Sequence, residues 1–323
     1  MSSKATRKRK TEKCKHHQSS PEQDSNENRG EHVQEETNQG IKIPWNRMLM
    51  RFILIGGLIF VMHIFSNSDD LVAFAKRDET VPKRRHSLPC SKDYADDLKK
   101  FKDCAPKHCG RVVMDGLIKE NEAERLLKVA KQGLALGGSN GGASILDLHS
   151  GALSKGNAFV DIYQLIESGS LDIFTKEDFD LYKKVASKVQ LAIAGEFSIP
   201  ANSLHLTKPT FFSRMNTKPA KTIHDEYWHP HVDKETYKTF DYTSLVYLSN
   251  YGNDFEGGRF VFIDKKSNST IEPKLGRLSF FTSGSENQHY VEKVSKGTRY
   301  AMTISFTCDK KERIDYPKLR KKQ

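Results

Sequence analysis

The sequence predicts an α+β fold in which a double-stranded β-helix, or jelly-roll barrel, is buttressed by helices. Apolar residues three and four positions apart recur between Glu120 and Leu134 and again after Thr175, which indicates two amphipathic helices. From Ser203 onward the pattern changes to short β-type runs separated by Gly, Asn, Asp and Pro. Many short strands with one alternating face favour a double-sheet barrel, with the helices packed on one side.

The ends of both helices can be predicted from single residues. The first helix is expected to stop at the glycine pair Gly137 and Gly138. The second is expected to begin at Thr175, whose side chain can cap it with Asp178 three residues later, and to end before Pro200. Its apolar stripe, which we expect to pack against a sheet, consists of Phe179, Tyr182, Val185, Val189, Ile193 and Phe197.

Residues 52–65 form the most apolar run of the chain. Taken as 46–66, this segment is just long enough to span a bilayer with help from snorkelling side chains. The polar region before it is far longer than the start of a cleaved signal peptide, so we predict a signal anchor. Basic residues before the run favour a cytoplasmic N-terminus, which gives a single-pass type II protein of the endoplasmic reticulum or Golgi.

Four cysteines follow the predicted anchor, at Cys90, Cys104, Cys109 and Cys308. An even number in an oxidising lumen favours two disulfides, whose pairing the sequence leaves open. A zinc site built on Cys104 and Cys109 is the alternative, but no His or Cys pair completes it at finger spacing. The sequon at Asn268 predicts N-glycosylation, which would fit lumenal exposure.

The formal net charge is +11, and basic residues cluster near both ends of the chain. No base-stacking motif or nucleic-acid recognition fold accompanies either cluster, so we expect solvated tails and no nucleic-acid partner. The predicted organisation is a disordered cytoplasmic tail (1–45), the anchor (46–66), a lumenal stem with the cysteine segment (67–110), a helical buttress (111–200), the barrel (201–309) and a basic tail (310–323). Barrel strands are expected at 210–215, 243–248, 259–263, 277–281 and 299–306.

His231 and Asp233 point to a metal site. Residues two apart in an extended segment face the same side, so an imidazole and a carboxylate can meet at one point. They make up two thirds of the two-histidine, one-carboxylate triad that binds non-haem iron(II). His289, on a distant strand, is the candidate for the third ligand. His229 could share the face of His231 but has no carboxylate at the required spacing, so we expect it to support the site or face the substrate.

Further motifs follow this pair in a recognisable order. Tyr247-Leu248 comes first, then Glu256-Gly257-Gly258-Arg259-Phe260, a block from Pro273 to Phe281, His289-x-Val291, and a block from Gly297 to Thr303. This order, over roughly residues 204–307, resembles that of the prolyl-4-hydroxylase-type 2-oxoglutarate- and iron-dependent oxygenases. The resemblance implies Fe(2+) held by His231, Asp233 and His289, with 2-oxoglutarate as cosubstrate, O2 as oxidant and L-ascorbate as reductant.

The distal carboxylate of 2-oxoglutarate would need a fixed cation. Arg299 offers a planar fork that suits a carboxylate, and Thr303, four residues along the same strand, can present a hydroxyl to the same face. The family pattern implies a similar role for Tyr247. The family's usual tyrosine on the strand before the HxD motif is missing, since Phe211, Phe212 and Arg214 occupy that region.

The sequence therefore predicts a membrane-anchored 2-oxoglutarate-dependent dioxygenase that acts on a protein or peptide. By analogy it would hydroxylate a prolyl or lysyl side chain and release succinate and CO2. Two alternatives to an active oxygenase fit the residues less well. A catalytically silent lumenal scaffold should have lost a metal ligand or Arg299, and neither is lost. A metal-binding jelly roll without oxidative chemistry would have no evident use for Arg299 with Thr303.

Overall fold

The computed structural model describes residues 45–66, 71–222 and 225–318. They divide into two units, one up to Phe60 and one from Val61 onward. The predicted anchor at 46–66 coincides with helix α1 (Trp45–Ser66). Among the described residues, no helix is both long and apolar enough to cross a membrane. Most of the predicted cytoplasmic tail, residues 1–44, lies outside the described residues.

The unit from Val61 onward is a jelly-roll-like barrel with helices, as predicted. Its described strands are β1 (Leu71–Ala75), β2 (Arg84–Leu88), β3 (Cys109–Met114), β4 (Gly138–Ser139), β5 (Ala143–Leu146), β6 (Ala152–Gly156), β7 (Ala158–Asp161), β8 (His205–Asn216), β9 (Tyr242–Tyr247), β10 (Phe255–Gly257), β11 (Phe260–Phe262), β12 (Asn268–Ile271), β13 (Leu278–Thr282), β14 (His289–Val291) and β15 (Val294–Thr307). Over the described residues, the minor sheet has four strands in the order β1-β12-β11-β14. The major sheet has eleven, in the order β2-β3-β13-β9-β15-β8-β5-β6-β4, with β10 beside β15 and β7 beside β6.

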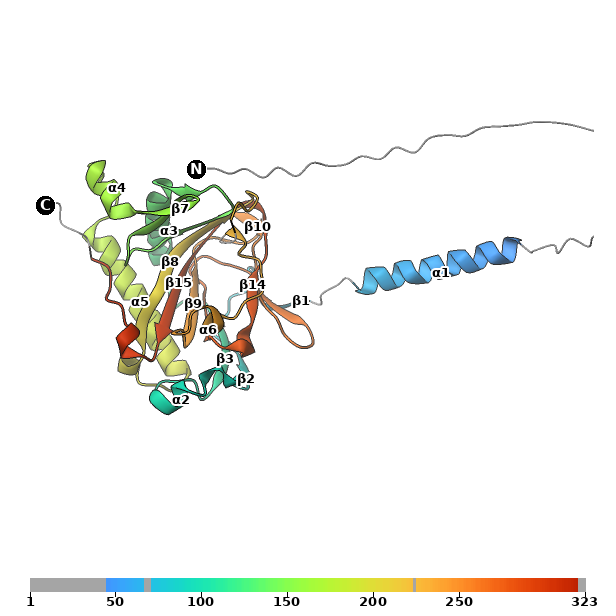
Figure 1. The fold of residues 1–323 in the computed structure, drawn as a ribbon, viewed down its shortest axis with the longest axis horizontal. Helices are drawn as coiled ribbons and strands as arrows, with labels where there is room; N and C mark the ends of the chain where they lie inside the picture. Colours follow the sequence, from blue (N-terminus) through green and yellow to red (C-terminus); the bar gives the residue numbers. More distant parts are fainter. Residues whose placement is uncertain (1–44, 67–70, 223–224, 319–323) are drawn as a thin grey trace, which may run out of the picture. The chain divides into compact units, whose positions relative to one another are not determined.

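The two predicted helices lie on the same side of the major sheet (Figure 1). They are α3 (Glu120–Ala135) and α5 (Lys176–Glu196), and all six residues of the predicted α5 stripe are buried. Thr175 caps α5 in a capping box with Asp178, as its sequence predicts. The shorter elements are α2 (Asp97–Lys100), α4 (Ile162–Ser168), α6 (Asp233–Thr236) and the 3-10 turns η1 (Lys92–Tyr94), η2 (Ala201–Ser203), η4 (Ser285–Asn287) and η5 (Lys310–Glu312).

Strand alternation divides the apolar residues into two cores. On β13, Leu278 and Phe280 join the core beneath the helices, whereas Phe281 joins the core inside the barrel. On β15, Met302 faces the helices and Ala301 faces the barrel interior. This alternation aims odd-numbered residues of β15 into the barrel, where the site is formed.

The predicted disulfides are present as Cys90–Cys109 and Cys104–Cys308. Because Cys104 and Cys109 each have a cysteine partner, the alternative of a zinc site on that pair is excluded for this structure. The second bridge connects the cysteine-bearing segment, through Cys104, to Cys308 just after β15.

The predicted boundaries of the barrel are too narrow. From Leu71 onward, the expected stem supplies β1, which pairs with β12, and β2, which pairs with β3. The expected helical buttress also contributes five strands, β3 to β7. At the other end, the expected basic tail packs on the core through Ile314 and Tyr316. These runs are short or polar, so their period-2 patterns are weak in the sequence.

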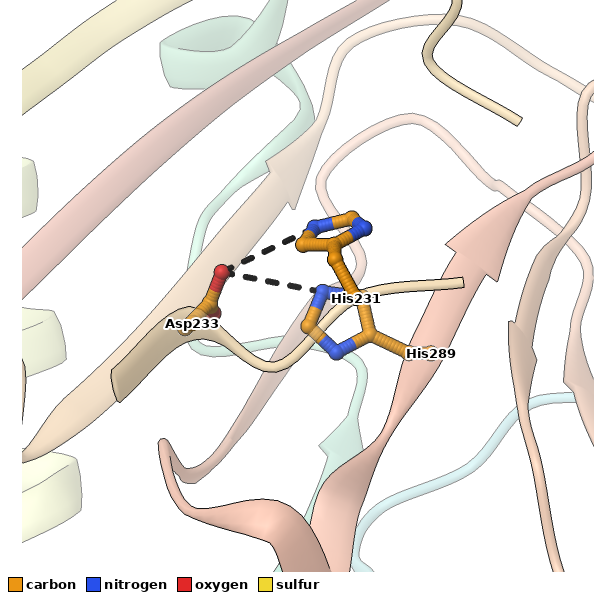
Figure 2. Close-up of side chains that lie close together, drawn as sticks. All are labelled: His231, Asp233 and His289. Carbon is orange, nitrogen blue, oxygen red and sulfur yellow. Dashed lines mark ion pairs between the residues drawn. The ribbon is translucent and has the colours of Figure 1, made fainter. Parts of the chain in front are cut away.

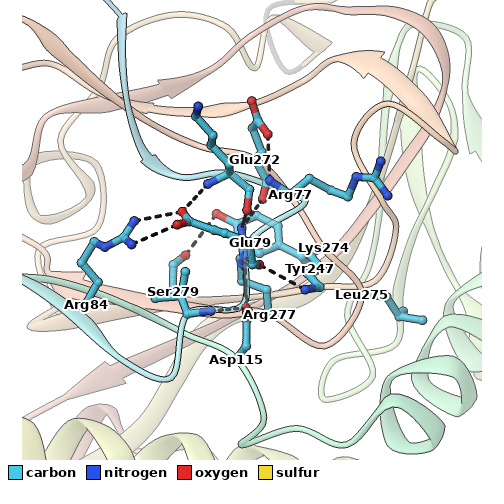
Figure 3. A network of polar contacts seen from close by, with 12 residues as sticks. Arg77, Glu79, Arg84, Asp115, Tyr247, Glu272, Lys274, Leu275, Arg277 and Ser279 are labelled. Atoms are coloured by element: carbon cyan, nitrogen blue, oxygen red, sulfur yellow. Dashed lines mark hydrogen bonds and ion pairs between the residues drawn. The ribbon is translucent and has the colours of Figure 1, made fainter.

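Buried Arg277 attaches the first strands to the barrel (Figure 3). Its fully buried guanidinium donates two hydrogen bonds to the Asp115 carboxylate, at 2.9 and 3.0 Å. It also donates to the carbonyl oxygens of Lys76, Glu79 and Glu272. The loop between β1 and β2 is thereby held by a side chain that lies far away in the sequence.

We expect Arg277→Met to destabilise the barrel by about 3–5 kcal/mol, because it leaves the Asp115 carboxylate without its charge partner. Urea unfolding followed by circular dichroism measures this difference. Arg313→Met is the matched control, since the Arg313 and Asp315 side chains are 52% and 82% exposed and should contribute little. Equal stability of the two variants would contradict the anchoring role of Arg277.

Candidate metal centre

The side chains of His231, Asp233 and His289 lie close together (Figure 2). His231 and His289 exchange backbone hydrogen bonds of 2.9 and 3.1 Å, and their rings lie 4.4 Å apart. Val232 is extended, as the sequence argument requires, and Asp233 then starts the one-turn helix α6. Asp233 Oδ1 lies 3.7 Å from Nε2 of His231 and 3.8 Å from Nε2 of His289. The ligand atoms of all three residues lie within 4.8 Å of one another, so one ion can contact them all.

Both imidazoles are oriented by backbone carbonyl groups. Nδ1 of His231 lies 3.0 Å from the carbonyl oxygen of His229, and Nδ1 of His289 lies 2.9 Å from that of Asn287. A carbonyl oxygen can only accept, so each Nδ1 carries the hydrogen. In the neutral tautomer with the hydrogen on Nδ1, Nε2 carries the lone pair and faces Asp233. A histidine needs this tautomer to bind a metal ion through Nε2.

The carboxylate of Asp233 is held by a pair of hydroxyl groups that sequence reasoning missed. Thr243 on β9 donates its hydroxyl to Oδ2 of Asp233 at 2.6 Å, and that hydroxyl lies 2.9 Å from the hydroxyl of Ser283. Oδ1 is thereby left toward the imidazoles. Thr243 shares the inward face of β9 with Tyr247, and this spacing could have indicated that Thr243 faces the site. The contact between Thr243 and Asp233, however, depends on the fold.

The two histidines differ in their exposure. His289 is buried among Phe260, Phe262 and Phe281, and it stacks on Phe260 with 4.8 Å between ring centroids. Burial lowers the pKa of His289 to about 4, so its imidazole is neutral at neutral pH. The side chain of His231 is 39% exposed. The site is therefore walled on one side and open to solvent on the other.

Arg299 lies on β15 with its guanidinium inside the protein. Its Nε donates to the carbonyl oxygen of Gly258 at 2.9 Å, and its Nη1 lies 3.7 Å from the sulfur of Met215. Its Nη2 is buried and has no hydrogen-bond partner among the described residues. A buried donor without an acceptor is costly, and a carboxylate is the acceptor that suits a guanidinium best. The donor sets of this arginine and of the triad thus fit a 2-oxo acid and a ferrous ion.

The other predicted cosubstrate residues face the same interior. The Tyr247 ring lies 5.6 Å from the Arg299 guanidinium carbon, and its hydroxyl is 3.1 Å from that of Ser279. Thr303 is half-buried on β15, with Phe211 beside it on β8 and Leu245 beside it on β9. Tyr247 already has a hydroxyl partner, so it is less available to a ligand than Arg299.

His229 and Asn268 lie away from the ion position. The His229 side chain is exposed and lies 2.6 Å from a Glu226 oxygen, so this residue supports His231 through its backbone carbonyl rather than its ring. Asn268 begins β12 and is half-buried, with its side-chain oxygen accepting from the N–H of Asp264. Neither side chain contributes to the metal centre.

A cavity of about 320 Å³ lies beside residues that contact Arg299 and Asp233. Met215 and Tyr237 both line this cavity. Met215 contacts Arg299, and the N–H of Tyr237 donates to the carbonyl oxygen of Asp233 at 2.7 Å. Asp225 is the acidic residue of the lining, and its oxygens accept from Ser139, Lys221 and Thr222. Other walls come from Pro209, Phe211, Tyr227 and Phe159.

Comparisons with known proteins agree with this geometry. Residues 217–307 match the family model described as the 2OG-Fe(II) oxygenase superfamily. The protein named 2-oxoglutarate and iron-dependent oxygenase domain-containing protein 3 of Xenopus tropicalis is 58% identical over 252 residues, which cover 77% of this chain and 79% of that protein. Its human namesake is 55% identical over 279 residues, which cover 84% and 87%. The chain belongs to the 2-oxoglutarate- and iron-dependent oxygenase family.

Membership of this oxygenase family confirms the predicted class of enzyme, a 2-oxoglutarate-dependent dioxygenase that uses Fe(2+), 2-oxoglutarate and O2. A more distant match is human prolyl 3-hydroxylase 1, which is 28% identical over 222 residues. That match covers 62% of this chain and 28% of the hydroxylase.

Proposed function

We propose that this oxygenase hydroxylates a protein or peptide side chain, with proline as the preferred residue and lysine as the runner-up. The overall reaction would turn 2-oxoglutarate, O2 and a C–H bond into succinate, CO2 and a C–OH group. The observation that carries the proposal is the pairing of the His231, Asp233 and His289 triad with Arg299, whose buried Nη2 has no partner among the described residues.

Each group in this chain has a defined task in the proposed reaction. The triad would hold iron on one face and leave its other positions to further ligands. Arg299 would bind the distal carboxylate of 2-oxoglutarate. The phenylalanines around His289 would exclude water from the walled side. When bound, iron, 2-oxoglutarate and O2 supply the oxidising chemistry, and L-ascorbate is proposed to keep the iron reduced.

The cavity beside the centre favours a neutral substrate side chain. Its walls are largely apolar and aromatic, and both oxygens of Asp225 already accept hydrogen bonds. A lysine ammonium group would thus find no unengaged carboxylate in the described lining, and its desolvation would be less well compensated than at a site with a free carboxylate. A proline ring needs no such partner. The match to a prolyl 3-hydroxylase supports the same choice.

The test uses the full-length chain with iron, 2-oxoglutarate and ascorbate. Matched peptide pools that differ only in proline or lysine at one position serve as substrates. Mass spectrometry should detect the gain of one oxygen atom in the proline pool, together with succinate, and neither with His231→Ala protein. Oxygen gain in the lysine pool alone would reverse the preference, and no gain in any peptide pool would count against peptide hydroxylation.

We infer further that the domain from Leu71 onward resides in the lumen of the endoplasmic reticulum or Golgi, as the predicted type II arrangement requires. Its two disulfides support an oxidising compartment. In sealed microsomes, added protease should spare this domain until detergent is present. Asn268→Gln should also migrate faster than wild type on gels if the sequon carries a glycan. Digestion of the domain without detergent would overturn the placement.

A further inference from the structure

Lys234, the residue directly after Asp233, is buried, although lysine side chains seldom are. Its side chain is only 6% exposed. It lies in α6, whose four residues form a single turn. A helix this short is not stable by itself, because ordering the first turn is unfavourable. Contacts from outside α6 must therefore hold the segment that carries the metal carboxylate.

The ammonium group of Lys234 joins α6 to the cysteine-bearing segment and to the residues just before β9. It lies 2.7 Å from a carboxylate oxygen of Asp97, in α2 of the cysteine-bearing segment. It also lies 3.0 Å from Asp241, which directly precedes β9, and donates to the carbonyl oxygen of Phe240 at 3.0 Å. The carbonyl oxygen of Lys238 is a further acceptor, at 3.5 Å, so four acceptors surround the three hydrogens of the ammonium group. The ammonium group of Lys234 is therefore held from several sides.

The same cluster reaches the groups that orient Asp233. The backbone N–H of Lys234 donates to the carbonyl oxygen of Ser283 at 2.9 Å, and the N–H of Ser283 donates to that of Asp241 at 3.0 Å. The Ser283 hydroxyl pairs with Thr243, which in turn donates to the Asp233 carboxylate. A shift of Lys234 would therefore disturb both the backbone and the hydrogen-bond partner of Asp233.

We propose that Lys234 is a positioning residue for the metal carboxylate. Its buried ion pairs with Asp97 and Asp241 hold α6, and thereby Asp233, in the geometry that binds the ion. The idea rests on the proposed function, since it takes His231, Asp233 and His289 as the metal centre. Lys234 itself acts only through α6, and it contributes no ligand atom.

The test is a titration of Mn²⁺, which does not require turnover, into the metal-free full-length chain. Lys234→Met keeps an unbranched side chain but leaves buried Asp241 and partly buried Asp97 without the cation between them. We expect its Mn²⁺ affinity to fall roughly 10–100-fold, the range seen when a partner behind a metal ligand is lost. Lys188→Met is the matched control, because Lys188 lies 2.7 Å from buried Glu122 in a cluster between α3 and α5. It should lower Tm but leave Mn²⁺ affinity unchanged.

A second variant keeps the test decisive if Lys234→Met fails to fold. Asp97→Asn removes one of the two charges at a site that is 22% exposed, and it should weaken Mn²⁺ binding several-fold while the fold persists. If Lys234→Met or Asp97→Asn bound Mn²⁺ as tightly as the control Lys188→Met does, the positioning role of Lys234 would be overturned. A wild-type chain that binds no Mn²⁺ would instead refute the metal centre, and the positioning role with it.

Discussion

Replacement of Asp233 by alanine is expected to abolish metal binding. The carboxylate is the one anionic group of the triad, and its Oδ1 lies less than 4 Å from both Nε2 atoms, at 3.7 and 3.8 Å. Without it, only the two imidazoles remain, and the side chain of His231 is 39% exposed to water. The loss of Fe²⁺ or Mn²⁺ affinity should exceed the roughly 10–100-fold drop caused by removing a partner behind a ligand. Titration of the metal-free protein measures this loss.

The matched control for this substitution is Asp178→Ala. Asp178 is also a buried carboxylate, but it caps α5 and pairs with Arg125. This variant should unfold at a lower temperature and bind the metal as wild type does. If Asp233→Ala and Asp178→Ala bound the ion equally well, Asp233 would not be a ligand.

Arg299→Ala should bind iron almost normally yet lose most of its affinity for 2-oxoglutarate. Removing the guanidinium leaves the buried distal carboxylate without its charge partner. The expected loss is roughly 2–5 kcal/mol, or about one to three orders of magnitude in Kd. Titration of 2-oxoglutarate into iron-loaded protein under anaerobic conditions measures the change.

Arg299→Lys is the informative companion to this variant. An ammonium group restores the charge but cannot reproduce the planar fork that would pair with a carboxylate, so only part of the affinity should return. Full recovery with lysine would show that charge alone matters. Unchanged affinity in Arg299→Ala would exclude Arg299 from the cosubstrate site.

The candidate ligand residues could be predicted from sequence because each has a local signal. His231 and Asp233 have the required spacing on an extended segment, and the ordered motifs from Tyr247 to Thr303 resemble those of a known family. The structure brings the three residues together, and within the described part of the chain Nη2 of Arg299 has no hydrogen-bond partner. Folding thus supplied the distances, while the sequence supplied the residue types.

The supporting contacts were beyond the reach of sequence reasoning. Thr243, Ser283 and Lys234 act through distances set by the sheet and by the turn into α6. His229 contributes a carbonyl oxygen, which any residue could supply, and its ring lies 2.6 Å from a Glu226 oxygen. A residue type predicts a contact only when its own side chain makes that contact.

The first strands were missed for a different reason. β1 and β2 have five residues each, and β2 is mostly polar, so their patterns resemble those of a linker. Their place in the sheets depends on pairing with β12 and β3 and on buried Arg277. Long-range partners of this kind cannot be read from a local window of sequence.

We infer that one site binds both iron and 2-oxoglutarate, with the triad at one end and Arg299 at the other. The most direct measurement is an anaerobic titration of 2-oxoglutarate into the wild-type chain, once loaded with iron and once metal-free. Because the 2-oxo acid would share its binding between the ion and Arg299, we predict clearly tighter binding to the iron-loaded protein. Equal affinity for 2-oxoglutarate with and without iron would contradict a shared site for the ion and the 2-oxo acid.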